Sequence, residues 1–157
     1  MRREKGVVLL LALVLSLLLG LLAASALRDA LVETRMTSYL SAGIDAFEQA
    51  EHTLLLGAAQ LQRAPPAPCQ ACQPPSRPHD LQGQWQSTES GYFQLQNLGN
   101  SSRVVHLPEG QQATLFRVTA VSRQTQSRHV LEAVYALPGG AASRPLRILW
   151  RQRLRES

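Results

Sequence analysis

The sequence predicts an α+β fold in which one long N-terminal helix packs against a small antiparallel β-sheet. Residues 7–27 carry no charge, and apolar residues continue at helical spacing as far as residue 63. From residue 91 onward, apolar and polar residues alternate in short runs that are separated by turn signals. These two periods are typical of a helix and of half-buried strands, respectively. A sheet with one apolar face needs a cover, and we expect the helix to provide it.

The first part of the predicted helix is a candidate membrane segment. Residues 1–6 form a short basic leader, and residues 7–27 add 21 uncharged residues. A helix needs ~20 apolar residues to cross the hydrocarbon core of a bilayer. Because basic residues precede the segment, we expect a single pass with a cytoplasmic N-terminus, and everything after residue 27 on the other side of the membrane.

Three fates of this segment are compatible with the sequence. It stays as a plain membrane anchor, or it is a secretory signal peptide that is cleaved after the small residues Ala24-Ser25-Ala26. In the third, cleavage on the cytoplasmic side after Gly6 leaves Val7 as the first residue. The apolar run is long for a signal peptide, and the helical pattern continues past Ala26.

Small residues form a possible packing seam on the apolar helix. Ser16, Gly20 and Ala24 lie four residues apart, on one side of the helix. Small residues at this spacing let two helices approach closely in lipid. Glycine and alanine are also common in any membrane helix, so the sequence leaves both interpretations open.

Residues 28–63 extend the helix as an amphipathic half that contains no proline. Its larger apolar residues recur at three- and four-residue steps; they are Val32, Met36, Tyr39, Leu40, Ile44, Phe47 and Leu54. Glu48 and Glu51 stand three residues apart and share one side of the helix. Paired carboxylates can perform acid–base chemistry. Since no histidine joins them in a recognisable motif, we interpret them as a solvated or partner-facing stripe.

A proline-rich connector, residues 64–90, follows the helix. Six prolines lie within residues 64–78 and must end the helix. The connector also contains Cys69 and Cys72, the only cysteines of the chain. A zinc site would need two further ligands, and His79 is the only histidine nearby. A thioredoxin-like redox pair needs a helix N-terminus within an α/β fold. The third interpretation is a local structural disulfide in an oxidising compartment.

The remaining residues, 91–157, are predicted to form the antiparallel sheet. We expect strands at residues 91–96, 103–107, 114–122, 129–137 and 146–154, joined by short turns into a meander. One face of the third strand should present Phe116, Val118 and Ala120, and one face of the fourth Leu131, Ala133, Tyr135 and Leu137. In the last strand, Leu146, Ile148, Trp150 and Leu154 are expected to point inward, and Arg147, Arg151 and Arg153 outward.

Nothing in the sequence indicates an enzyme. It contains no phosphate loop, nucleophile elbow or zinc-protease motif, and its four histidines lie far apart on different predicted elements. We therefore expect no catalytic residue, metal, cofactor or small-molecule substrate. The formal net charge is +5, and residues 103–155 contain nine arginines. A basic face could meet phosphates, anionic headgroups or an acidic protein, or it could simply be solvated. We do not expect a nucleic-acid partner.

Several short motifs in the first 60 residues or so occur in a recognisable order. Arg3-Glu4-Lys5-Gly6 precedes the aliphatic run, and Ala26-Leu27-Arg28 lies at the membrane exit. Glu33-Thr34-Arg35-Met36 follows, and residues 46–51 read Ala-Phe-Glu-Gln-Ala-Glu. This part of the chain resembles the PilX-type minor pilins of type IV pili, which are also called pilus assembly proteins.

The resemblance implies a pilin-like fold and a processing pathway. A prepilin peptidase would cleave after Gly6, and Val7 would be N-methylated. The precursor would lie in the inner membrane with its C-terminal domain in the periplasm, and the processed chain would enter a pilus with other minor pilins as partners. Roles in pilus assembly, twitching motility or adhesion would follow. Alternatives are a minor pseudopilin of type II secretion, or a membrane-anchored or secreted periplasmic binding or thiol-redox module.

Two positions depart from the pattern of the family. Most pilins have phenylalanine directly after the cleavage site, where this chain has Val7. Most major pilins have glutamate at the fifth position of the mature chain, where this chain has Leu11. In pilins that glutamate is thought to pair with the terminal ammonium of the subunit already in the filament. A chain without it is expected at the tip of a pilus or in a priming complex.

Overall fold

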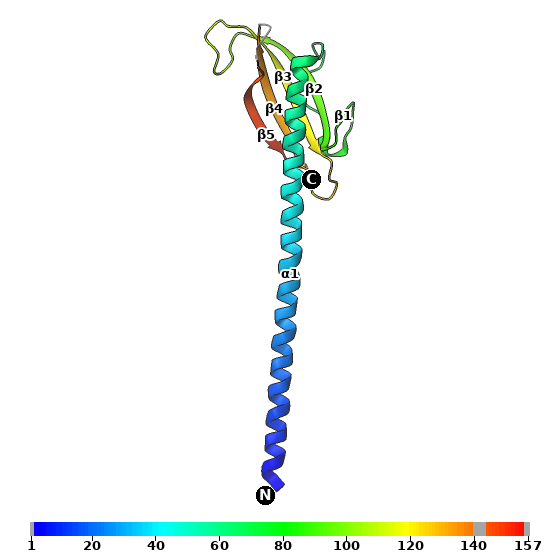
Figure 1. Ribbon diagram of the computed structural model, residues 1–157, viewed down its shortest axis with the longest axis vertical. Coiled ribbons are helices and arrows are strands. Elements are labelled where there is room, and N and C mark those ends of the chain that lie inside the picture. Colours follow the sequence, from blue (N-terminus) through cyan, green and yellow to red (C-terminus); the bar gives the residue numbers. More distant parts are fainter. Residues whose placement is uncertain (1, 140–143, 156–157) are drawn as a thin grey trace. The chain divides into compact units, whose positions relative to one another are not determined.

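The computed structural model describes residues 2–139 and 144–155, and the side chains of all of these except residues 2–5. A long helix, α1 (Arg2–Arg63), is followed by a 3-10 turn, η1 (Pro78–Asp80), and then by the strands of the sheet (Figure 1). The strands are β1 (Gln86–Ser87), β2 (Gly91–Ser101), β3 (Ala113–Ser122), β4 (Val130–Pro138) and β5 (Leu146–Arg153). The predicted α+β fold, with a long helix packed on an antiparallel sheet, is confirmed.

The chain divides into two compact units, Met1–Ser41 and Ala42–Ser157. In the first unit, every described side chain from Gly6 to Ser41 is exposed, including the whole apolar segment. By length and composition, α1 is able to cross a membrane. An apolar surface of this extent is unfavourable in water, so the segment requires lipid or other protein around it.

In the second unit, the strands form a five-stranded meander in the order β1-β2-β3-β4-β5, and all neighbours are antiparallel. The strand predicted at residues 103–107 is wrong, because β2 continues to Ser101 and a loop follows in which His106 has a φ of 70°. An irregularity between Asn97 and Gly99 lets β2 stay paired with β3 through Ser101, where the sequence predicted a turn between two strands. Val104 and Leu107 of the loop pack against Ala113 and Ala136. Because the loop contributes apolar residues to the core, its sequence resembles that of a half-buried strand.

The second half of α1 covers one face of the sheet (Figure 1). Its buried residues are mostly small; they are Ala46, Ala50, Thr53, Leu54, Gly57, Ala58 and Leu61. They pack against the predicted apolar faces of β3 and β4, which present Phe116, Val118, Ala120, Leu131, Ala133, Tyr135 and Leu137. Contact with a sheet favours small residues because they let the helix backbone approach it closely.

Of the apolar residues predicted at helical spacing in the second half of α1, only the last two pack on the sheet. Leu54 is buried and Phe47 is partly buried against the core. The other five predicted members are exposed; they are Val32, Met36, Tyr39, Leu40 and Ile44. Four of these five precede the second unit, and therefore lie before the part of the helix that packs on the sheet. Helical spacing identifies a possible apolar face but does not say where along the helix a partner begins.

A bulge in β5 overturns the predicted alternation of that strand. Val134 pairs with Leu149 and Tyr135 with Arg147, so Ile148 is an extra residue that has no partner on β4. A one-residue insertion reverses which side chains share a face. Trp150 lies on the helix side, edge-on to Phe47 with ring centroids 6.4 Å apart. Leu146 pairs with Ala136 and Ile148 packs with it, both on the other face, and Leu154 is exposed.

Gly57 marks the closest approach of α1 to the sheet. A Cβ atom at this position would lie 2.6 Å from Cγ1 of Val118 and 3.2 Å from Cδ2 of Phe93. Gly43, in the same helix, has no heavy atom within 4 Å of the corresponding position. The two glycines therefore provide a matched pair, because they differ in what surrounds them but not in helical conformation.

We expect Gly57→Ala to lower the free energy of unfolding, since overpacking costs ~1–3 kcal/mol and the gain in helix propensity is only ~1 kcal/mol. Gly43→Ala should raise it by up to ~1 kcal/mol. Guanidinium denaturation of the full chain in detergent, followed by tryptophan fluorescence, measures both. Equal stabilisation by the two substitutions would show that α1 does not pack closely at Gly57.

Candidate functional site

The second face of the sheet is covered by the proline-rich connector, which three arginines hold in place. Nη1 of Arg117, on β3, donates a hydrogen bond to the carbonyl of Cys72 at 2.8 Å. Nη1 of Arg153, on β5, donates to the carbonyl of Pro75 at 2.7 Å. Arg128, between β4 and β3, donates to the carbonyl of His79 at 2.6 Å. The connector therefore runs across the sheet from β3 to the end of β5, opposite the helix.

A buried carboxylate lies beneath the connector. Glu132, on β4, is 2% exposed and pairs with Arg151 of β5, whose Nη2 lies 2.6 Å from Oε1. Arg117 Nε lies 3.7 Å from Oε1, and Arg153 Nη1 lies 3.9 Å from Oε2. A buried carboxylate is tolerated only when it is paired, and here neighbouring strands supply the cations. Since three arginines surround one glutamate, the cluster retains a positive excess.

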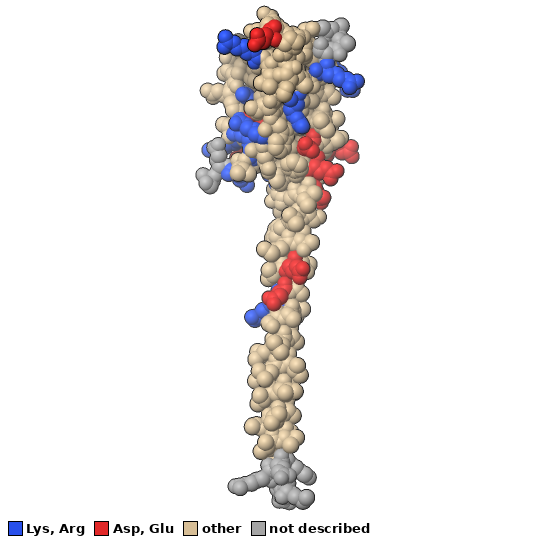
Figure 2. All heavy atoms as spheres, turned by 90° about the vertical axis from the view of Figure 1, so that its left-hand side faces the viewer, with Lys and Arg blue, Asp and Glu red and all other residues tan. Residues whose placement is uncertain are grey.

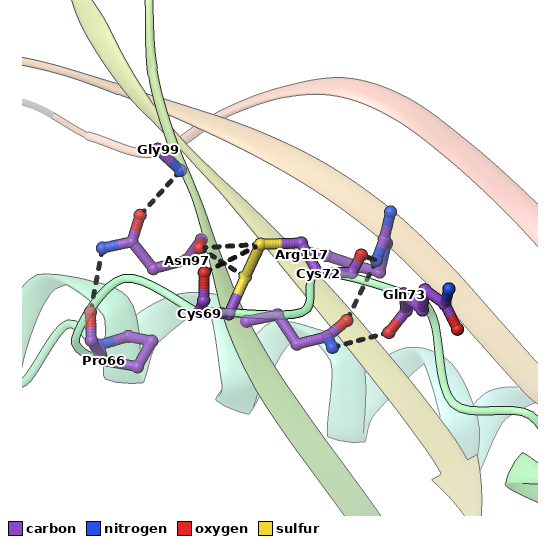
Figure 3. Close-up of a disulfide and its surroundings, with 8 residues drawn as sticks. Pro66, Cys69, Cys72, Gln73, Asn97, Gly99 and Arg117 are labelled. Carbon is purple, nitrogen blue, oxygen red and sulfur yellow. Dashed lines mark hydrogen bonds between the residues drawn. A yellow bond between two sulfur atoms is a disulfide. The ribbon is translucent and has the colours of Figure 1, made fainter.

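The two cysteines form a disulfide at the edge of β2 (Figure 3). The backbone N–H of Cys69 donates to the carbonyl of Asn97 at 3.1 Å, and the Asn97 side chain donates to the carbonyl of Pro66 at 3.0 Å. Gly99 N–H donates back to Oδ1 of Asn97 at 3.0 Å. The short β1 pairs only with Tyr92 and Phe93, so this connector turn covers the edge of β2 that β1 leaves open.

Covering an edge in this way prevents pairing with another chain. Of the three interpretations of the Cys-Gln-Ala-Cys segment, this geometry favours the local structural disulfide. A thioredoxin-like pair would place its first cysteine at a helix N-terminus, whereas Cys69 lies in an irregular segment between α1 and η1. Among the described residues, no group of three or more metal-binding side chains is assembled.

The predicted packing seam and processing site lie in the first unit. Ser16, Gly20 and Ala24 are exposed on α1, as are Gly6 and Val7. The hydroxyl of Ser16 donates to the carbonyl of Ala12 at 2.8 Å, so its polarity is satisfied within the helix. The side chains of residues 2–5 lie outside the described residues, as does Met1. The structure thus leaves the seam available to a neighbouring helix.

The predicted acidic stripe lies on the exposed side of α1 in the second unit. Glu48 and Glu51 are exposed, and neither forms a salt bridge with a described residue. Glu48 shares a shallow groove with Asp45, His52 and Ser90. In the second unit, called the head below, acidic side chains gather on the right-hand side in Figure 2, with a basic side chain directly above them. The stripe is therefore free to meet a basic partner.

His52 and Ser90 form the arrangement closest to a nucleophile and its base. Nδ1 of His52 lies 2.9 Å from Oγ of Ser90. The same hydroxyl also lies 2.9 Å from Oγ1 of Thr53 and 3.4 Å from Oγ1 of Thr88. These contacts join the β1–β2 turn to α1, so we interpret the pair as a structural link. Sequence reasoning missed it because its members are 38 residues apart.

A basic groove lies at the end of β5, between the connector and residues 153–155. Its walls include Arg77, His79, Asp80, Arg153 and Arg155. An adjoining hollow is lined by both His79 and His129, so the prediction that the histidines lie far apart is wrong for these two. Burial lowers the pKa of His79, and the charges of Arg155 and Arg153 lower it further. Only the folded connector brings these residues together, because they come from three separate segments.

Glu132→Gln tests the buried cluster. The substitution keeps the shape of the side chain but leaves three arginines without their counter-charge, so we expect a loss of ~3 kcal/mol in the free energy of unfolding. Asp80→Asn is the matched control, because the Asp80–Arg155 pair is exposed and such pairs contribute ~1 kcal/mol or less. Chemical denaturation of both variants provides the measurement. If Glu132→Gln lowers the free energy of unfolding no more than Asp80→Asn does, the buried cluster does not stabilise the fold.

The described residues thus bring together a covered sheet, a disulfide-capped edge, an exposed acidic stripe and a basic groove. Of these four features, the acidic stripe and the basic groove are the ones exposed to a partner. Comparisons of the chain with protein-family models, with curated proteins and with solved structures find no match.

Proposed function

We propose that this chain is a minor pilin that takes part in the assembly of a type IV pilus, at its tip or in the complex that initiates it. The observation that carries the proposal is α1. One continuous helix of 62 residues combines an exposed uncharged segment with a C-terminal part that covers a small antiparallel sheet. The motifs along residues 3–51 that resemble those of PilX-type pilins agree with this division of the helix.

The exposed apolar segment supports the proposal that the helix moves from the membrane into a filament during assembly. Its leucine and valine side chains are about half to two-thirds exposed, and removing such surface from water is worth ~25 cal/mol per Å². Lipid satisfies this requirement before assembly, and the helices of other subunits satisfy it afterwards. The seam of Ser16, Gly20 and Ala24 would allow close contact with such helices.

The absence of an acidic side chain at Leu11 supports placement at the tip. In this proposal a prepilin peptidase removes residues 1–6 and Val7 acquires the terminal ammonium. A subunit added beneath another must neutralise the ammonium of that neighbour, because an unpaired buried charge is costly. Leu11 cannot do so, whereas the first subunit of an assembly has no neighbour to neutralise.

The proposed partners follow from the same argument. They are other minor pilins and pilus assembly proteins, with Glu48 and Glu51 as a stripe that faces them. The precursor would lie in the inner membrane with its head in the periplasm, where the Cys69–Cys72 disulfide would persist. Contributions to twitching motility or adhesion would be consequences of assembly. A minor pseudopilin of type II secretion would need the same helix and the same processing, and it is the second candidate.

Processing after Gly6 is the first test. Mass spectrometry of the membrane-extracted protein should show loss of residues 1–6 and one methyl group on Val7. Gly6→Val should leave the precursor intact, because a β-branched side chain should not fit a peptidase pocket that accepts glycine. Gly20→Val is the matched control, since it changes the same residue type within the same helix and should be processed normally.

A mature terminus at Leu27 would instead identify a cleaved signal peptide, and the pilin proposal would fail. The chain would then be a secreted periplasmic module, and the disulfide-bonded connector would be the place to look for binding or thiol chemistry. An uncleaved N-terminus would identify a plain membrane anchor and would equally exclude the pilin.

Placement along the filament is the second test. Immunogold labelling should detect the wild-type chain at pilus tips, and deletion of the chain should lower the number of pili without changing their diameter. Leu11→Glu supplies the missing carboxylate and should move some copies into the shaft. Leu11→Gln is the control, because it adds polarity without charge and should leave the distribution unchanged. Regular labelling of wild-type shafts would exclude tip placement.

A further inference from the structure

The basic groove at the end of β5 has a volume of 370 Å³ and is enclosed by parts of the connector and of the chain around Arg153. This volume lies near the lower limit of pockets that take small molecules, which is ~300 Å³. The groove therefore suits a compact ligand better than an extended segment of a protein. Its polar lining comes largely from arginine, histidine and serine side chains.

The groove has more positive than negative side chains. Arg77, Arg153 and Arg155 line it together with one carboxylate, Asp80, so three positive charges face one negative charge. Asp80 pairs with Arg155 at 3.0 Å. Arg153 approaches Glu132, but that carboxylate is shared with two other arginines.

The side chain of Arg77 forms neither a hydrogen bond nor an ion pair with any described residue, and only its backbone carbonyl is engaged, by the N–H of Asp80 at 3.2 Å. Its guanidinium is therefore the donor at the groove that remains unused. Arginine presents planar pairs of N–H donors that match the oxygens of phosphate and carboxylate groups.

The pKa of His79 is consistent with this excess of positive charge in the groove. Its pKa is lowered first by burial and then by the charges of Arg155 and Arg153, which the opposite effect of Asp80 does not cancel. Arg128, which lines the adjoining hollow, lowers it as well. Because its pKa is lowered, the imidazole of His79 is uncharged at neutral pH. It can form a hydrogen bond beside the arginines without repelling their positive charges.

We propose that this groove binds a terminal phosphate group, held by the guanidinium groups of Arg77 and Arg155 beside His79. A phosphate monoester carries a charge of about −1.5 to −2 at neutral pH, which balances the excess of the groove in a single group. A carboxylate brings only half of that charge. The phosphate could belong to a soluble ester or pyrophosphate, or to the headgroup of a lipid such as phosphatidic acid. This inference does not depend on the proposed role in a pilus.

The binding test uses the full chain in a neutral detergent and calorimetric titration with pyrophosphate at low ionic strength. The Arg77→Gln/Arg155→Gln double variant should bind at least about tenfold more weakly, because it loses two charge-assisted contacts. The matched control is Arg63→Gln/Arg103→Gln, which removes the same charge from outside the groove and should stay within about twofold of the wild type. Equal weakening of the two double variants, or no binding by the wild type to any phosphate probe, would overturn the proposal.

A second measurement follows the imidazole of His79 by NMR. Pyrophosphate should raise the pKa of His79, because an anion in the groove offsets the arginine charges that lower it. The charged and titratable groups around this imidazole are Arg77, Asp80, Arg128, His129, Arg153 and Arg155. The control double variant should show the same rise, and the groove variant should not. Pyrophosphate binding with an unchanged His79 would place the phosphate elsewhere and overturn the assignment.

Two further probes distinguish the source of the ligand. Binding of pyrophosphate but not of short-chain phosphatidic acid would identify a soluble phosphate compound, and binding of the lipid would identify a headgroup. A glutamate-rich peptide tests the other class of partner. If the peptide binds through Arg77 and Arg155 and neither phosphate compound does, the groove is a contact for an acidic protein and the phosphate assignment is wrong.

Discussion

Close packing between α1 and the sheet is the constraint on which the second unit depends. Gly57 lies so near Val118 and Phe93 that an added Cβ atom would collide with Val118, and alanines occupy three of the other six buried positions of the helix face. Because the helix approaches closely, the larger residues of β3 and β4 can fill the core, with Phe116, Leu131 and Tyr135 among them. Bulky residues on the helix would hold it away from the sheet and leave cavities beside these side chains.

With one face occupied by the helix, the other face is left to charged residues and the connector. Glu132 is tolerated there because arginines from both neighbouring strands, β3 and β5, lie around it. Two of the same arginines also donate to connector carbonyls. One set of side chains therefore neutralises the carboxylate and holds the connector across the sheet. Placing the connector there also caps the open edge of β2 and forms one wall of the basic groove.

The two units make different demands on their surroundings. The head buries its own core and protects one sheet edge, whereas the described residues of the first unit bury nothing. A chain of this kind is incomplete without lipid or other helices around its apolar segment. In the proposed function, pilus assembly meets this requirement. The surfaces on which the two proposals rest are exposed ones: the seam on α1, the acidic stripe and the basic groove.

The sequence by itself determined the features that depend on neighbouring residues. The continuous helix through residues 7–27, its end before the prolines and the apolar faces of β3 and β4 follow from local patterns, and the structure confirms these three features. Tertiary structure alone decided the rest. The bulge at Ile148 exchanges faces in β5 because pairing with β4 sets its register, and β2 extends to Ser101 because β3 offers partners to that point. The groove around His79 exists only because the connector returns across the sheet to residues more than 70 positions later, a contact between distant residues that no local pattern encodes.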